Sequence, residues 1–130
     1  MAAWQVFTVS RRSKIHVPPC FRPEVEERDF DKWFGKYHPD VIVSHDRRIF
    51  RWVEERGLRC PDDVGVARLS IGGDETFYSG VYENNPIIGA TAVDILVGLL
   101  QRGQFGVPRF PTRTLVEGEW RENKTVRRQG

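Results

Sequence analysis

A short helical pattern between two apolar runs is the feature that most constrains the fold of this chain. Residues 40–44 (DVIVS) are rich in β-branched side chains, and residues 64–71 (VGVARLSI) form a second apolar run, as expected of strands covered on both faces. Between them, Ile49, Phe50 and Val53 recur at the spacing of one helix face. A helix that joins two such strands requires a right-handed parallel crossover. We therefore predict a three-layer α/β/α fold around a mostly parallel sheet, with residues 40–44 as an inner strand.

Three further segments complete the expected order of elements. Aromatic residues at the spacing of one helix face predict a helix with an aromatic core side: Phe30, Trp33, Phe34 and Tyr37. Pro39 should end that helix. Residues 2–9 suit a helix or a strand, of which we prefer the helix, and residues 113–120 alternate well enough for a final strand. The polar residues 121–130 are expected to be frayed.

A long apolar helix is predicted after Asn85, which can cap it, with Pro86 in its first turn and Gly103 after its last. Apolar side chains cover most of its circumference and leave only a narrow polar stripe. One apolar face should pack on the sheet, and the rest requires another cover, such as a second subunit. We therefore expect a homodimer whose interface includes Ile88, Ala92, Ile95, Leu96 and Leu99.

Composition narrows the class of protein. The 130 residues suit a single domain, and 39% hydrophobic and 29% charged residues are typical of a globular chain. A net charge of +2 without a basic helix stripe argues against direct binding of nucleic acid. Cys20 and Cys60 lie far apart and predict neither a disulfide scaffold nor a zinc ribbon. No signal peptide or membrane-spanning run is recognised, so we expect a cytoplasmic protein without a membrane partner.

Candidate binding residues follow the two central strands and open the long helix. Ligands of open parallel sheets bind beyond the carboxyl ends of the strands, where these three corners can converge. The set offers hydroxyl, imidazole, carboxylate and amide groups that suit a polyol or a heterocycle: Ser44, His45, Asp46, Ser70 and Asn85. Ser44 or Asp46 can instead cap the helix that follows, and Asn85 can cap its own helix.

Catalytic and metal-binding alternatives have less support in the sequence. His45 and Asp46 with Ser70 supply the parts of a nucleophilic triad, but no Gly-x-Ser-x-Gly elbow surrounds the serine. Histidine and cysteine residues lack metal-ligand spacing. Gly72 and Gly73 lack the other glycines of a dinucleotide fingerprint and the lysine of a phosphate loop. We expect no enzyme activity, no cofactor and no metal.

Four sequence blocks in order, HPDVIVSHD, GLRCPDDVGVARLS, ENNPIIGATAVDILVGLLQRG and PTRTLVEGEW, resemble signature blocks of the LacI/GalR family of bacterial transcription regulators. The resemblance covers residues 30–120 and implies the C-terminal subdomain of a type I periplasmic-binding-protein-like effector domain. Residues 1–29 would lead into it, and residues 121–130 would form a polar tail. The chain is therefore expected to be a fragment that lacks the helix-turn-helix.

The resemblance implies that the regulator clasps a small effector, such as a sugar or a nucleobase, between two subdomains. Operator DNA would be bound only through the missing N-terminal domain, and the same subdomain would dimerise. Family members usually carry Asn-Asp where this chain has His45 and Asp46, and an aspartate that takes ligand hydroxyls where it has Ser70. This departure argues against ordinary sugar recognition. The alternatives are a solute-binding protein of a transport system and, with less support, a small enzyme on a doubly wound sheet.

Overall fold

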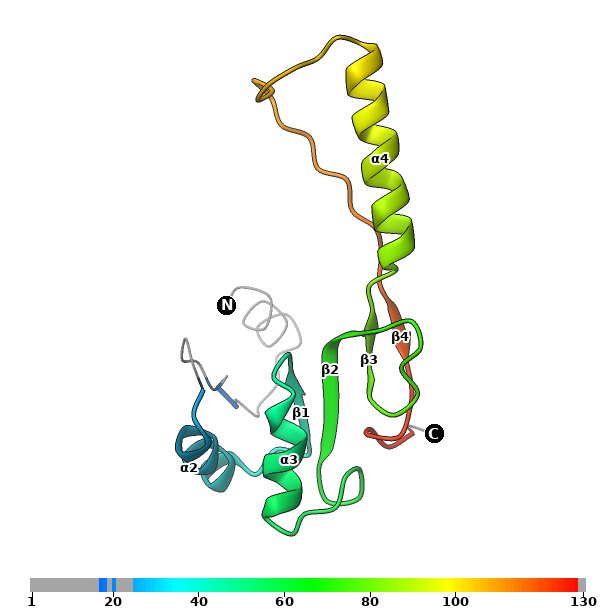
Figure 1. Cartoon of the computed structure of the whole chain (residues 1–130). Helices are drawn as coiled ribbons and strands as arrows, with labels where there is room; N and C mark the ends of the chain where they lie inside the picture. Colours follow the sequence, from blue (N-terminus) through cyan, green and yellow to red (C-terminus); the bar gives the residue numbers. More distant parts are fainter. Residues whose placement is uncertain (1–16, 19, 21–24, 129–130) are drawn as a thin grey trace. The chain divides into compact units, whose positions relative to one another are not determined.

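The structure is a computed structural model that describes residues 17, 18, 20 and 25–128 (Figure 1). The chain divides into two compact units, Met1–Asp40 and Val41–Gly130. The helix predicted for residues 2–9 lies outside the described residues.

The first unit contains the predicted aromatic helix, α2 (Glu27–Tyr37). Phe30 is 1% exposed, and its ring stacks on that of Phe34 at 5.6 Å between centroids. The indole N–H of Trp33 donates a hydrogen bond of 2.6 Å to the Pro18 carbonyl. His38 ends the helix in a left-handed conformation with φ of 40°, directly before Pro39. The aromatic spacing and the proline therefore placed this helix correctly.

The second unit is built on a four-stranded sheet in the order β1-β2-β3-β4. Its strands are β1 (Val41–Ser44), β2 (Gly65–Ile71), β3 (Ser79–Tyr82) and β4 (Glu119–Arg121). β1, β2 and β3 are parallel, and β4 pairs with β3 in the antiparallel direction. The predicted α/β class with a mostly parallel sheet is confirmed.

Helix α3 (Arg48–Glu55) joins β1 to β2 and carries much of the core. Ile49, Trp52 and Val53 on α3 are at most 5% exposed, and Ile42 and Val66 on the strands are at most 6% exposed. Burial of these side chains supplies the main driving force for forming the crossover.

The prediction that residues 40–44 form an inner strand is wrong. Among the described strands, β1 stands at the edge of the sheet, and β2 and β3 are the inner strands. Val41 and Val43 are 45% and 54% exposed, whereas Ile42 between them is 6% exposed. Side chains alternate between the two faces of a strand, so only one face of β1 is buried. A run of β-branched residues predicts a strand but does not reveal how many neighbours it has.

The connection from β2 to β3 contains residues 72–78 and no helix. Such a short parallel connection is possible because Ser79 pairs with Ala67, so that β3 begins midway along β2. The chain must return over only about 13 Å, at 3.3 Å for each residue of a strand.

The expectation that residues 121–130 are frayed is wrong for the described part of that segment. Thr125 is 1% exposed, and its backbone carbonyl accepts a hydrogen bond of 2.7 Å from the Val66 N–H. Its hydroxyl accepts a bond from the Ser79 N–H and donates one to the Val66 carbonyl. The Asn123 side-chain amide donates to the carbonyls of Glu75 and Tyr78. β3 begins opposite Ala67, so backbone N–H and C=O groups before that point have no β3 partner. The polar residues of this segment are held in place because they make hydrogen bonds to such groups.

The long helix, α4 (Asn85–Gln101), forms as predicted but does not pack on the sheet. None of its residues is buried. β3 ends at Tyr82, and only two residues separate it from α4, so the helix continues beyond the end of the strand (Figure 1). Asn84 rather than Asn85 holds the cap position, with φ of 56°, and Gly103 follows the helix with φ of 63°.

The final strand is much shorter than the predicted residues 113–120. Only Glu119–Arg121 pair, because Glu119 lies opposite Tyr82, the last residue of β3. Residues before Glu119 have no β3 residue opposite them, and their alternation alone cannot make a strand.

Candidate functional site

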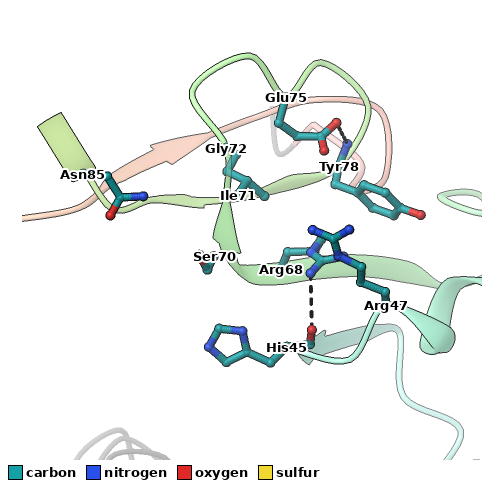
Figure 2. Close-up of a pocket in the computed structure, with 9 residues that line it drawn as sticks. All are labelled: His45, Arg47, Arg68, Ser70, Ile71, Gly72, Glu75, Tyr78 and Asn85. Atoms are coloured by element: carbon teal, nitrogen blue, oxygen red, sulfur yellow. Dashed lines mark hydrogen bonds between the residues drawn. The ribbon is translucent and has the colours of Figure 1, made fainter.

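A polar hollow of about 510 Å³ lies at the carboxyl ends of β1 and β2 (Figure 2). Segments distant in the sequence line it: the turn after β1, the end of β2, the β2–β3 loop and the first residue of α4. The lining residues are His45, Arg47, Arg68, Ser70, Ile71, Gly72, Glu75, Tyr78 and Asn85. This is the edge at which open parallel sheets bind their ligands.

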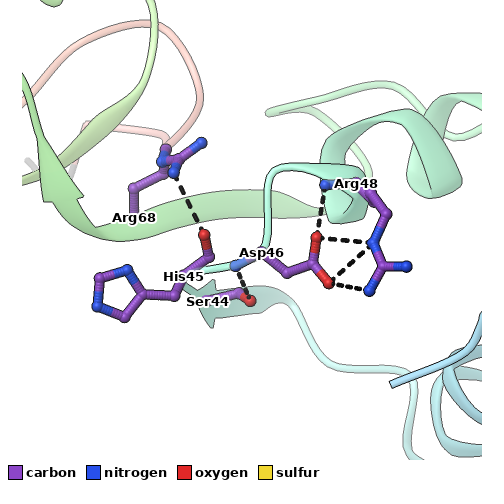
Figure 3. A network of polar contacts seen from close by, with 5 residues as sticks. All are labelled: Ser44, His45, Asp46, Arg48 and Arg68. Carbon is purple, nitrogen blue, oxygen red and sulfur yellow. Dashed lines mark hydrogen bonds and ion pairs between the residues drawn. The ribbon is translucent and has the colours of Figure 1, made fainter. Parts of the chain in front are cut away.

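The turn after β1 is held by its own side chains (Figure 3). The Ser44 hydroxyl accepts a hydrogen bond of 2.9 Å from the Asp46 N–H. The Asp46 carboxylate accepts one of 2.9 Å from the Arg48 N–H and two-point contacts from the Arg48 guanidinium, the shortest at 2.7 Å. The hydrogen bond from the Arg48 side chain lowers the pKa of Asp46 below its ordinary value of 3.8. Asp46 therefore stays ionised and starts α3, and this turn directs His45 towards the hollow.

Two arginines bring positive charge to the hollow. Arg68 donates a hydrogen bond of 3.3 Å to the His45 carbonyl, and its guanidinium lies 5.3 Å from the centre of the Tyr78 ring. Arg47 lies between the β1 turn and α3, and its side chain extends into the hollow (Figure 2). A guanidinium carries five N–H donors, so Arg68 keeps donors for a ligand after its bond to His45.

The β2–β3 loop is stiffened by the side chain of Glu75. Its carboxylate accepts hydrogen bonds of 2.8 Å and 3.1 Å from the backbone N–H groups of Phe77 and Tyr78. These bonds lower the pKa of Glu75 below 4.5. The Phe50 ring makes edge contacts with the rings of Phe77 and Tyr78 at 5.3 Å and 5.5 Å. The loop wall of the hollow is thus anchored to α3.

A carboxylate stands next to Ser70, near the end of β2. The Ser70 hydroxyl donates a hydrogen bond of 2.8 Å to Oε2 of Glu83. The Asn84 side-chain amide donates one of 2.8 Å to the Glu117 carbonyl, which leaves Asn85 at the rim of the hollow. The Glu83 carboxylate thus stands beside Ser70, on the segment that connects β3 to α4.

The structure brings together three of the five predicted binding residues, His45, Ser70 and Asn85. Ser44 and Asp46 do not line the hollow, because their side chains stabilise the turn and the start of α3. Sequence reasoning missed four polar or aromatic lining residues: Arg47, Arg68, Glu75 and Tyr78. An arginine inside an otherwise apolar strand, as at position 68, was a signal that could have pointed to the site.

Within the described part of the chain, no group of three or more His, Cys, Asp or Glu side chains is placed to hold a metal ion. A search of the same residues for a helix long and apolar enough to cross a membrane finds none.

Comparisons with known proteins locate this fold among solved structures. Neither the protein-family models nor the curated proteins contain a match. The crystal structure of a transcription regulator like protein from Staphylococcus haemolyticus is similar, with a TM-score of 0.59 and 20% sequence identity. The match covers 79% of this chain and 39% of that chain, so this chain spans about two fifths of that protein's length. The chain therefore shares an α/β fold, with a mostly parallel sheet, with part of a protein described as regulator-like.

Proposed function

We propose that this chain is the effector-sensing part of a bacterial transcription regulator of the LacI/GalR kind. The observation that carries the proposal is the polar hollow at the carboxyl ends of parallel strands, lined from several distant segments. The fold shared with a regulator-like protein and the four signature blocks support the same assignment.

The hollow is suited to binding and offers no reactive pair. The Ser70 hydroxyl donates a hydrogen bond to Glu83 and not to a histidine, so Ser70 lacks the partner that activates a serine nucleophile in a triad. In a regulator, a ligand that binds one arrangement of two lobes more tightly shifts the population towards it and alters operator binding. We accordingly place the protein in the cytoplasm and assign operator contacts to a separate domain.

Thermal unfolding in the presence of a ligand panel tests the proposal. We expect at least one of a set of sugars, sugar acids, sugar phosphates and nucleobases to stabilise the chain. A ligand at ten times its Kd adds about 1.4 kcal/mol to the free energy of unfolding. His45→Ala should reduce that stabilisation, and Thr114→Ala, at an exposed position outside the hollow, should not. No response from the panel, or an equal response of wild type and His45→Ala, would contradict binding at this site.

We further propose that α4 joins two copies of the chain. Its large apolar side chains include Ile95 and Leu96, 43% and 55% exposed, and apolar residues also occupy the opposite side of the helix, as at Val97, 44% exposed. A contiguous apolar surface of this kind marks an interaction site. Two copies of one helix can bury the same stripe against each other around a two-fold axis. The expected interface is the stripe Ile88, Ala92, Ile95, Leu96 and Leu99.

Light scattering on a matched pair of variants tests this interface. Leu96→Glu should convert a dimer to a monomer that remains folded, because no α4 residue is buried in the single chain. Gln101→Glu puts the same charge on the polar stripe of the same helix, on the side away from the interface, and should leave the dimer intact. A wild-type monomer, or equal dissociation of both variants, would reject the α4 interface.

A further inference from the structure

The charged side chains around the hollow differ in how many of their hydrogen-bonding groups already have partners within the chain. Three of the carboxylates in or beside the hollow accept a hydrogen bond from their own surroundings: Asp46 from Arg48, Glu75 from its loop, and Glu83 from Ser70. The Asp74 carboxylate lies next to Gly72 of the lining. These bonds occupy part of the hydrogen-bonding capacity of each of these three carboxylates. Among the described residues, the Arg68 side chain makes one hydrogen bond, to the His45 carbonyl, and its charge also acts on the carboxylates of Asp46 and Glu75. Most of its N–H donors therefore remain open to a ligand.

Arg47 and Arg68 approach the same cavity from different elements, one from the start of α3 and the other from β2. Like charges that line one cavity repel each other until an anion lies between them. Guanidinium groups match carboxylate and phosphate oxygens with paired N–H donors, which makes them the preferred protein groups for binding these anions. The other side of the hollow offers Ser70 and Asn85, which suit neutral hydroxyl or amide groups.

We propose that the hollow binds a small ligand with an anionic head, a phosphate monoester or a carboxylate, held by Arg47 and Arg68. Ser70 and Asn85 face the neutral polar part of the same ligand. This inference rests on the proposed function and adds the chemical class of the effector. It also accounts for an arginine at position 68, where a ligand with hydroxyl groups alone would not require a positive charge.

NMR titration of the ¹⁵N-labelled chain tests the inference, since it detects weak binding and locates it. The probes are glucose 6-phosphate, gluconate and glucose at constant ionic strength, so that the first two distinguish a phosphate from a carboxylate head. We expect one of the anions to shift the side-chain resonances of Arg47 and Arg68, with glucose binding at least about tenfold more weakly.

The test variant is Arg47→Gln and its control is Arg51→Gln. Each removes one positive charge, from the residue before α3 and from within α3, respectively. Arg51 does not line the hollow, and its ion pair with Glu55 is exposed. Arg47→Gln should weaken binding of the anion about tenfold and change that of glucose by less than about twofold, and Arg51→Gln should change neither.

Three results would overturn the inference. Glucose binding in the hollow as tightly as either anion would reject the anionic class while leaving the proposed function in place. Equal weakening by Arg47→Gln and Arg51→Gln would show attraction to general positive charge instead of a site. Absence of any shift in the hollow with all three probes would reject the anionic class, and a negative ligand panel in thermal unfolding would reject the proposed function separately.

Discussion

Thr125→Val tests the buried hydrogen bonds that join Thr125 to strands β2 and β3. The Thr125 hydroxyl accepts a hydrogen bond of 2.9 Å from the Ser79 N–H and donates one of 2.6 Å to the Val66 carbonyl. Thr125 and Ser79 are 1% and 0% exposed, so water cannot replace these bonds. Valine has nearly the same shape as threonine and removes both bonds at once.

The cost of Thr125→Val follows from the groups it leaves without partners. A buried N–H without a hydrogen bond costs about 1–3 kcal/mol, and loss of the bond to the Val66 oxygen adds about 1 kcal/mol. The free energy of unfolding should therefore fall by about 2–4 kcal/mol. With a urea slope of about 2 kcal/mol per molar, the unfolding midpoint should fall by about 1–2 M.

Urea unfolding followed by far-UV circular dichroism measures this change. Thr125→Ser keeps the hydroxyl and loses only a methyl group, so it should cost less than Thr125→Val, about 1 kcal/mol. Thr114→Val, on an exposed residue, should change the free energy of unfolding by less than about 0.5 kcal/mol. The reasoning is refuted if Thr125→Val unfolds at the wild-type midpoint, or if Thr125→Ser is the more destabilised of the two.

Three further predictions concern separate parts of the chain. A Cβ on Gly80 would lie 2.4 Å from the Arg68 carbonyl oxygen, whereas a Cβ on Gly89 would meet nothing within 4 Å. Gly80→Ala should therefore lower the free energy of unfolding by about 1–3 kcal/mol, and Gly89→Ala, inside α4, should raise it by about 0.5–1 kcal/mol. Urea midpoints that fall equally in the two variants would contradict this prediction. Because the pKa of Asp46 lies below 3.8 in the folded chain, its ionised form contributes stability at pH 7 that is lost as the pH falls through and below that value. The difference in urea midpoint between wild type and Asp46→Asn should therefore shrink from pH 7 to pH 3. A larger difference at pH 3 would contradict the lowered pKa. Burial raises the pKa of the Cys60 thiol above 9.0. In a Cys20→Ser chain at pH 8, Cys60 should therefore react with a disulfide reagent more slowly when the chain is folded than when it is unfolded in urea. Equal rates in the two states would argue against its burial.

Several features of this protein could be read from local sequence because they depend on local physics. The helical spacing of Ile49 and Val53 predicted α3, and both residues are core side chains. Pro86 and Gly103 bracketed α4 because proline suits the first turn of a helix and glycine suits the positive φ that follows the last. Polar residues after buried strands also predicted where the hollow would lie, because parallel strands end at one edge.

Other features were decided only by the tertiary structure, because they depend on pairs of residues far apart in the chain. Periodicity cannot tell whether β1 has one neighbour or two, and it cannot foresee that α4 continues beyond β3 without crossing the sheet. Thr125 is buried through bonds to residues 46 and 59 positions away, which nothing in the polar segment 121–130 indicates. Arg68 faces the hollow because the register of β2 and the loop carrying Tyr78 place it there. The apolar pattern therefore determined which segments form elements, and the pairing of those elements determined which side chains share the site.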